Sequence, residues 1–202
     1  ALLARLAPMA TIPLTGDGRA RFAVALPAGD AIALDGEVEA LDVLLDDRPI
    51  RLLEPAHFRW DADGLEVEGL WFAHHEDEIF LRWAVDSDGA VRGNMSGTLD
   101  ALLLRFLIPD WEPDGRVSGV VELLGTVEAP RLEGIVEIAD GSFRVPGTST
   151  ILADIDGTAL LSSDEAVLEG VGFRFMRGQA HASGRVIVRE GRVELALDGD
   201  VS

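Results

Sequence analysis

The chain has 202 residues, with 36 acidic side chains against 17 basic ones and a formal net charge of −19. A surface this acidic repels phosphate, which disfavours nucleic-acid binding and attachment to anionic lipid headgroups through a broad basic patch. The chain has no cysteine, which excludes disulfides and thiolate sites. The sequence also has no apolar run long enough for a transmembrane helix, so none is predicted.

Apolar residues nevertheless make up 48 % of the chain, and they alternate with polar residues along most of it. In the first such run, Ala20, Phe22 and Val24 share one face, opposite Arg19 and Arg21. The same alternation returns in segments 116–127, 132–138, 185–189 and 192–198. This pattern predicts antiparallel strands that each have one apolar face and one charged face.

Pairs of an acidic residue and glycine predict tight hairpin turns between these runs, because such pairs readily adopt positive φ. They are Asp63-Gly64, Asp88-Gly89, Asp140-Gly141 and Glu190-Gly191. In particular, we interpret Asp140-Gly141 as a turn between two short strands within 130–146. The sequence therefore predicts an all-β fold in which an antiparallel meander pairs each strand with the next.

The chain also contains an internal echo. Leu65–Phe72 resembles Ala166–Phe173, and each run carries a Glu-Gly pair at the same place. This similarity predicts two loose repeat blocks, 19–97 and 115–202, joined by the segment 98–114.

The joining segment departs from the alternating pattern. Thr98 or Asp100 can cap the start of a helix, and Pro109 ends it. The sequence therefore predicts one short helix near 99–108, followed by a loop. Because this helix carries few charges, we expect it to lie against the open apolar face of the sheet.

An ordered series of short motifs follows the Leu-rich joining segment. Its members are Gly115-Arg116-Val117-Ser118-Gly119, Pro130-Arg131-Leu132-Glu133-Gly134, Asp140-Gly141-Ser142-Phe143-Arg144-Val145-Pro146 and Ala182-Ser183-Gly184-Arg185-Val186. This series resembles the TamB-type and wider AsmA-like proteins of diderm bacteria, most strongly over 98–202. Because the chain begins with Ala1 and not Met, we interpret residues 1–202 as a fragment of one elongated β domain of such a protein.

The resemblance implies a sheet curled lengthwise into a trough, known as a β-taco, on a periplasmic protein anchored in the inner membrane. It implies a bridge that shields phospholipid acyl chains between the inner and outer membranes and supports outer-membrane biogenesis. It brings no catalytic residue and no cofactor, so an enzyme is not expected. An outer-membrane assembly barrel protein is an expected partner, through regions outside this chain.

The apolar faces of the predicted strands supply the candidate lipid-groove residues. They are Val117, Val121, Leu123, Val136, Ile138, Phe143, Val145, Val186, Val188, Val193, Leu195 and Leu197. Each methylene shielded from water contributes about 0.8 kcal/mol, so a continuous apolar groove would remove most of the cost of exposing two acyl chains. If two walls of the sheet instead pack about 10 Å apart, the same residues form an ordinary sandwich core.

Two other hypotheses remain open. The first is a structural or assembly scaffold, whose exposed edge strands would pair with strands of an outer-membrane β-barrel protein during its assembly or secretion. The second is an enzyme or carbohydrate-binding sandwich, which would need a compact cleft with convergent polar groups. The sequence contains no nucleophile elbow, P-loop or dinucleotide-binding fingerprint.

One cluster has the residue types of a metal site, His74-His75-Glu76-Asp77-Glu78. Adjacent strand residues point to opposite faces, so His74 and His75 are not expected to share an ion, and a solvated acidic loop is the favoured interpretation. Asp61-Ala62-Asp63-Gly64 and Asp86-Ser87-Asp88-Gly89 resemble the start of a calcium loop but lack its later ligands, so hairpin turns explain them better. No metal site is predicted.

The four tryptophans have two possible roles, in core packing or in lining a ligand path. They are Trp60, Trp71, Trp83 and Trp111.

Overall fold

The computed structural model describes residues 14–25, 32–45, 48–101, 112–144, 149–163, 165–175, 178–189 and 192–201. Nearly all of these residues belong to thirteen β-strands, and no α-helix occurs among them. The strands are β1 (Leu14–Ala25), β2 (Ala33–Leu45), β3 (Arg48–Leu52), β4 (Ala56–Asp61), β5 (Gly64–His74), β6 (Asp77–Asp86), β7 (Val91–Asp100), β8 (Glu112–Gly125), β9 (Pro130–Arg144), β10 (Ile151–Ser163), β11 (Glu165–Phe175), β12 (Gly178–Arg189) and β13 (Arg192–Val201).

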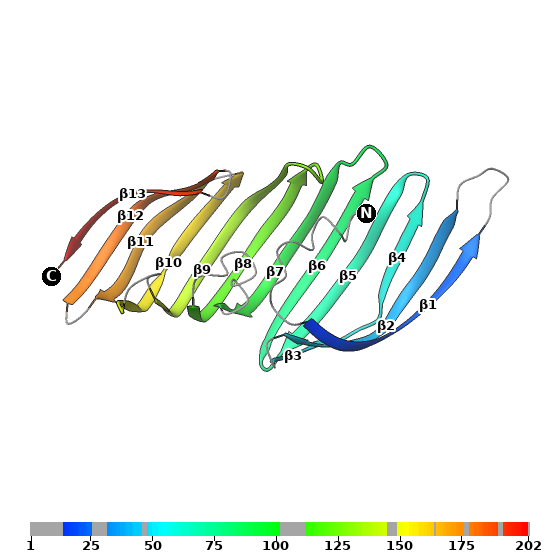
Figure 1. Ribbon diagram of the computed structural model, residues 1–202, viewed down its shortest axis with the longest axis horizontal. Coiled ribbons are helices and arrows are strands. Elements are labelled where there is room, and N and C mark those ends of the chain that lie inside the picture. The colour runs from blue at the N-terminus through cyan, green and yellow to red at the C-terminus, as the bar shows by residue number, and fades with distance from the viewer. Residues whose placement is uncertain are drawn as a thin grey trace. The chain divides into compact units, whose positions relative to one another are not determined.

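The strands form an antiparallel meander in which sequence neighbours pair (Figure 1). Strands β3 and β4 are the exception, because both lie between β2 and β5. The C-terminal part of β2 pairs with β3, and the N-terminal part pairs with β4. The predicted all-β antiparallel meander is confirmed.

The chain divides into two compact units. We call residues 14–97 and 120–133 the N-terminal unit, and residues 98–119 and 134–202 the C-terminal unit. The division runs through β8 and β9, so it differs from the block boundaries that the internal echo suggested.

The predicted helix near 99–108 is not observed among the described residues. Leu99 and Asp100 instead end strand β7, and residues 102–111 lie outside the description. Strand β7 includes Thr98 and runs to Asp100, so the extended backbone continues past the first expected helix cap.

The predicted turn at Asp140-Gly141 is wrong, since β9 runs unbroken from Pro130 to Arg144. Asp140 has a φ of 52°, so the strand kinks there without reversing. The backbone N–H of Asp140 donates to Oδ1 of Asp156 at 3.0 Å. A Cβ on Gly141 would lie 3.0 Å from Cβ of Ile155, so this glycine serves close strand packing.

The two earlier acidic-glycine pairs do form hairpins. Asp61 pairs with Gly64 across the β4–β5 turn, and Val85 pairs with Val91 across the β6–β7 turn. Glu190-Gly191 lies outside the described residues, although Arg189 and Arg192 on either side of it are paired.

The internal echo corresponds to a shared backbone irregularity, a β-bulge in each copy. The pairing of β5 with β6 shifts between Val67 and Leu70, and that of β11 with β12 shifts between Leu168 and Val171. Each bulge contains a glycine with positive φ, as bulges of this type require. The extra glycine keeps the apolar residues before and after it on one face.

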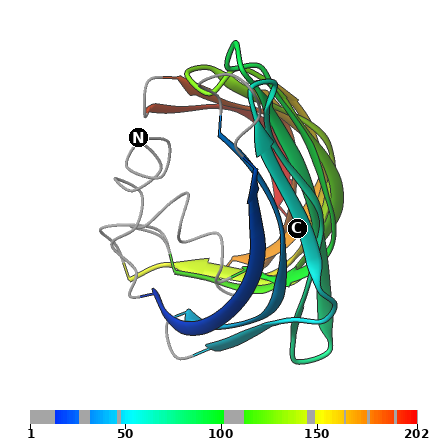
Figure 2. The same cartoon turned by 90° about the vertical axis from the view of Figure 1, so that its right-hand side faces the viewer.

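A third irregularity bends the first hairpin. Arg19 and Ala20 of β1 pair with Ala40 and Val38 of β2, which leaves Glu39 as an extra residue. Bulges increase local twist and bend strands, and β1 is visibly curved along its length (Figure 2).

Candidate functional site

The N-terminal unit has one continuous apolar face, which the strand register defines. Residues that pair directly lie on the same face of the sheet. Cross-strand rows on this face include Val24–Leu34–Trp60–Leu65–Val85, Phe22–Gly36–Phe58–Val67–Trp83 and Leu52–Phe72–Ile79–Gly97. Every strand of the unit from β1 to β7 therefore contributes apolar positions to one surface.

The centre of this face is a cluster of four buried residues, Leu52, Ala56, Val67 and Leu70. Partly buried apolar residues pack around it: Val38, Leu41, Phe58, Leu65, Phe72, Leu81 and Trp83. Toward its margins the face is open, with Trp60 at 50 % and Phe22 at 61 % exposure.

The C-terminal unit has an apolar face of the same construction. Its rows across β11, β12 and β13 are Ala166–Val186–Leu195, Leu168–Gly184–Leu197, Val171–Ala182–Gly199 and Phe173–Ala180–Val201. Small residues dominate β12, where Ala180, Ala182 and Gly184 occupy successive positions of this face. Among the described side chains of β10 to β12, the buried apolar ones are Ile155, Ala159, Val171 and Ala180.

The side chains of eight sequence-predicted groove residues are described, and they fall into three groups by burial. Val117 and Val121 of β8 are buried, at 6 % and 5 % exposure, while Leu197 of β13 is 46 % exposed. The half-buried members are Leu123, Val136, Ile138, Phe143 and Val186. Val145 lies outside the described residues, and only the backbone is described for Val188, Val193 and Leu195.

The register brings the predicted residues of β12 and β13 together. Val186 pairs with Leu195, and Val188 pairs with Val193. The aromatic members of the N-terminal face, Phe22 and Phe58 among them, were missed as groove candidates. The alternation of the sequence around each of them could have identified both.

The tryptophans divide between the two faces. Trp60 and Trp83 lie on the apolar face, in register with Leu65 and Val67. Trp71 lies on the opposite face, where its indole N–H donates to Oε2 of Glu78 at 3.1 Å. The Gly69 bulge explains this division, because it shifts the alternation of β5 between Val67 and Trp71. Trp111 lies outside the described residues.

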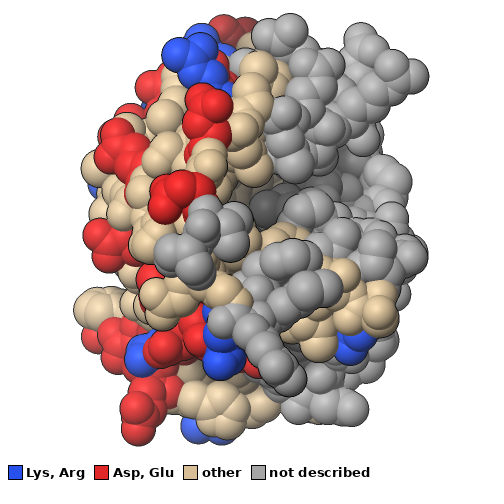
Figure 3. All heavy atoms as spheres, turned by 90° about the vertical axis from the view of Figure 1, so that its left-hand side faces the viewer, with Lys and Arg blue, Asp and Glu red and all other residues tan. Residues whose placement is uncertain are grey.

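The opposite face of each unit carries the charges. In the N-terminal unit one row runs Asp35–Arg59–Glu66–Ala84–Arg92. In the C-terminal unit the guanidinium of Arg174 lies 3.0 Å from Asp154, and that of Arg185 lies 3.2 Å from Glu165. These ion pairs are largely exposed and contribute little stability. In the view of Figure 3, acidic side chains spread over the described surface with basic ones set among them.

One of these exposed pairs joins β2 to β3. Nε of Arg51 donates to Oδ1 of Asp42 at 2.8 Å. This hydrogen bond, together with the charge of Asp42, raises the pKa of the Arg51 guanidinium.

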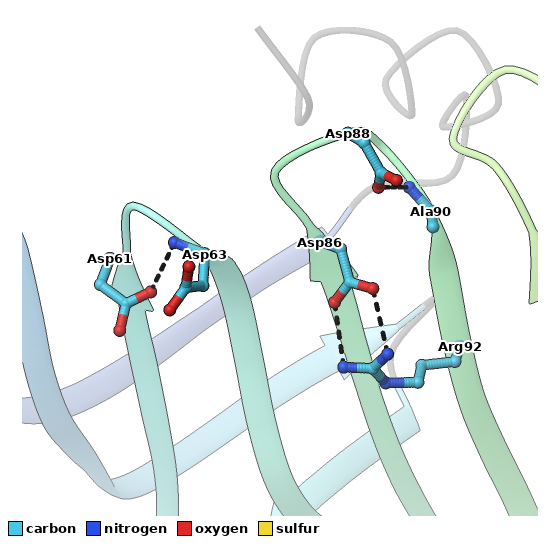
Figure 4. Close-up of polar contacts among 6 residues, drawn as sticks. All are labelled: Asp61, Asp63, Asp86, Asp88, Ala90 and Arg92. Carbon is cyan, nitrogen blue, oxygen red and sulfur yellow. Dashed lines mark hydrogen bonds and ion pairs between the residues drawn. The ribbon is translucent and has the colours of Figure 1, made fainter.

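Acidic side chains shape the turns at one end of the N-terminal unit (Figure 4). Oδ1 of Asp61 accepts the backbone N–H of Asp63 at 2.9 Å, and Oδ1 of Asp88 accepts that of Ala90 at 3.0 Å. The hydrogen bond from Asp63 is the main reason that the pKa of Asp61 is lowered, and Arg59 adds to the effect. Arg92 holds Asp86 through two hydrogen bonds, at 2.9 and 3.0 Å.

The histidine cluster lies at the β5–β6 turn. His74 is 4 % exposed, and its Nδ1 donates to the carbonyl oxygen of Pro49 at 2.8 Å. Its buried Nε2 has no hydrogen-bond partner among the described residues. The sequence predicted that the rings of His74 and His75 point to opposite faces of a strand. His75 instead belongs to the turn, with a φ of 53°. Its ring therefore meets that of His74 edge to face, with 4.4 Å between the ring centroids.

Two features are absent from the described residues. No group of three or more His, Asp or Glu side chains in this part of the chain is arranged to hold a metal ion. Within the same residues, no helix has the length and apolar character needed to cross a membrane.

Comparison of the chain with family models found no match, and comparisons with curated proteins and with solved structures also found none.

Proposed function

We propose that the apolar faces of the two units hold phospholipid acyl chains as lipids pass between the inner and outer membranes of a diderm bacterium. In this proposal the chain belongs to a periplasmic protein, anchored in the inner membrane, that supports outer-membrane biogenesis. The motif series that resembles TamB-type and AsmA-like proteins supports this setting. The proposal involves no catalytic step and no cofactor.

The incomplete cover of the apolar faces carries the proposal. In a sandwich, two facing sheets interdigitate and bury their large side chains. Among the described residues no large side chain is completely buried, and Trp60 on the apolar face remains half exposed. Apolar surface left open in this way is typical of a binding site.

The arrangement of the faces suits acyl chains. Each row crosses several strands, and neighbouring strands are about 4.8 Å apart. An acyl chain lying along a row would therefore keep apolar contact from strand to strand. Each buried methylene contributes about 0.8 kcal/mol, so contact along a whole chain provides several kcal/mol of binding without any headgroup recognition.

Photo-crosslinking tests the proposal directly. A crosslinking amino acid replaces Trp60 or Val186 on the apolar faces, and phosphatidylethanolamine vesicles with a radiolabelled lipid are the probe. The matched controls are Arg59 and Arg185, each the sequence neighbour on the charged face. We expect labelled adducts at Trp60 and Val186 and few at Arg59 and Arg185.

Two outcomes would contradict this function. Equal labelling of both faces would indicate adsorption to vesicles without a lipid site. An absence of adducts at Trp60 and Val186, in protein with an unchanged circular dichroism spectrum, would exclude an accessible lipid site at either position.

A second candidate is the assembly scaffold, which the open sheet edges support. Within the described residues, β1 and β13 each have a strand neighbour on one side only. A strand of an outer-membrane β-barrel protein could add to such an edge. If this is the function, proline at outward-facing amides of β1 should abolish capture of a client strand and leave lipid crosslinking unchanged.

A further inference from the structure

Backbone irregularities cross three neighbouring strands of the C-terminal unit. Asp140 of β9, Asp154 of β10 and Gly170 of β11 have φ values of 52°, 51° and 59°. The pairing of β10 with β11 shifts on both sides of Asp156, which itself pairs with Gly172. We call this line of irregularities the crease. Because a bulge bends its strand, irregularities at neighbouring positions of adjacent strands bend the sheet along one line.

The first two irregular residues are each held by a side chain of the next strand. The backbone N–H of Asp140 donates to Oδ1 of Asp156 at 3.0 Å. The guanidinium of Arg174, on β11, donates to both carboxylate oxygens of Asp154, at 3.0 and 3.2 Å. In both cases the contact joins the irregular strand to its neighbour on the charged face.

The third irregularity is held in the same way. The hydroxyl of Ser183, on β12, accepts the backbone N–H of Gly170 at 3.0 Å. We call these three interactions the crease contacts. All three are exposed, and exposed hydrogen bonds and ion pairs contribute little to stability. They can therefore break and form again while the strands on either side stay paired.

The crease has room to move on the charged face. A hollow of about 360 Å³ lies over it, and its lining includes Asp154, Asp156, Gly170, Gly172, Arg174 and His181. A Cβ on Gly170 would meet nothing within 4 Å, whereas a Cβ on Gly69 of the N-terminal unit would lie 3.2 Å from the ring of Phe80. The bulge in β11 is therefore not packed against an aromatic side chain as its counterpart in β5 is.

The residues of the crease keep the bend when the contacts break. Glycine adopts a left-handed backbone without strain, and aspartate does so more readily than most other residues. Loss of the contacts should thus loosen the bend and not remove it. The apolar face is the other side of the same strands, so a change in the bend changes the spacing of its side chains.

We infer that the crease is an adjustable bend, and that the three crease contacts set its angle and so the width of the apolar face of the C-terminal unit. When the contacts break, the sheet flattens and the apolar side chains on either side of the crease move apart. The effect on lipid access rests on the proposed function, but the adjustable bend does not.

Spin-label distances test the bend without lipid. The chain has no cysteine, so cysteines at Gln179 and Ile187 give one label on each side of Ser183 along β12. The variant Asp156→Ala with Arg174→Gln and Ser183→Ala removes all three contacts and leaves the net charge unchanged. We expect a narrow distance distribution in the parent chain and a broader one, with a shifted mean, in the variant. If the triple variant does not fold, each single substitution should broaden the distribution in part.

A matched control carries Glu165→Gln with Arg185→Gln, which breaks an exposed ion pair of 3.2 Å on the same face, away from the crease. It should keep the distance distribution of the parent chain. A crease variant with the parent's distribution would overturn the inference. Equal broadening in the control would also overturn it, because the looseness would then not belong to the crease.

Lipid crosslinking measures the effect on the apolar face. With phosphatidylethanolamine vesicles as the probe, adducts at Val186 are compared with adducts at Trp60, which belongs to the other unit and serves as the reference. We expect the ratio of Val186 to Trp60 adducts to rise several-fold in the crease variant. A broadened distance distribution with an unchanged ratio would refute the link to the apolar face. A parent chain without adducts at either position would contradict the proposed function, and the spin-label distances would still decide whether the crease bends.

Discussion

The two bulges of the internal echo share a backbone and differ in what surrounds it. Gly69 of β5 has a φ of 66° and Gly170 of β11 a φ of 59°. A Cβ on Gly69 would lie 3.2 Å from the ring of Phe80, whereas a Cβ on Gly170 would meet nothing within 4 Å. Glycine is thus required at both places by the backbone, and at Gly69 by packing as well.

The residue opposite each bulge also differs. In the C-terminal unit, the hydroxyl of Ser183 accepts the backbone N–H of Gly170 at 3.0 Å. In the N-terminal unit the equivalent position is Arg82, whose Nε donates instead to Asn94 at 2.9 Å. The two bulges therefore share their glycine and differ in what the side chain opposite it does.

Of the substitutions that test this comparison, Gly69→Ala should lower the stability of the protein most. Alanine at this position must adopt the left-handed backbone conformation, and its Cβ presses against Phe80. We therefore expect the free energy of unfolding to fall by about 2 to 3 kcal/mol. Urea unfolding followed by circular dichroism measures the loss. Gly18→Ala is a control without positive φ, where the nearest atom is the flexible end of Leu41, and it should change stability little.

Gly170→Ala should have a smaller effect. The only cost is that of placing alanine in the left-handed backbone conformation. The expected loss of unfolding free energy is therefore about 1 kcal/mol in the same measurement. A loss equal to or greater than that for Gly69→Ala would show that packing against Phe80 does not separate the two bulges.

The substitution Ser183→Ala removes the hydrogen bond at the C-terminal bulge only. The bond is exposed, so the expected loss of unfolding free energy is roughly 0.5 to 1 kcal/mol. Faster hydrogen exchange at the Gly170 amide is the more specific readout. Ser183→Thr keeps the hydroxyl and should restore slow exchange; if it does not, the hydroxyl is not what protects this amide.

Acid should distinguish the bulges from the hairpin turns, and this is the smallest expected effect. The lowered pKa of Asp61 means that its hydrogen bond to Asp63 stabilises the β4–β5 turn above the ordinary carboxyl range. That contribution is lost as the pH falls through the lowered pKa. The Asp63 amide should then exchange faster, whereas the Gly170 amide, bonded to a hydroxyl, should not respond.

The variant Asp61→Asn provides the control for this titration. Its side-chain amide oxygen can still accept the Asp63 N–H but does not titrate in this range. Acid-induced exchange at Asp63 that persists in this variant would assign the effect to another group.

The sequence predicted the faces of the strands well because alternation is a local property. Arg19, Arg21 and Phe22 lie on the faces that their positions indicate, and the echo at Gly69 and Gly170 identified equivalent strands. The bulges themselves were not predicted, since a Glu-Gly pair in an alternating run looks the same whether it forms a turn or an extra residue.

The errors arose where distant residues decide the local structure. Asp140-Gly141 has the composition of a turn, but Ile155 and Asp156 of the next strand hold it within β9. Burial could not be predicted either, because alternation identifies an apolar face without showing what covers it. Val121 and Leu197 fit the same pattern, yet one is buried and the other is almost half exposed.

The bulges have a further consequence for how the chain finds its native pairing. Strands with a strict period of two can slide past one another by two residues and still match apolar with apolar, so a long meander offers many nearly equivalent misalignments. An extra glycine opposite one particular residue removes that degeneracy. Gly69 and Gly170 thus favour one strand register over the alternatives. Without them we expect slower refolding through mispaired intermediates.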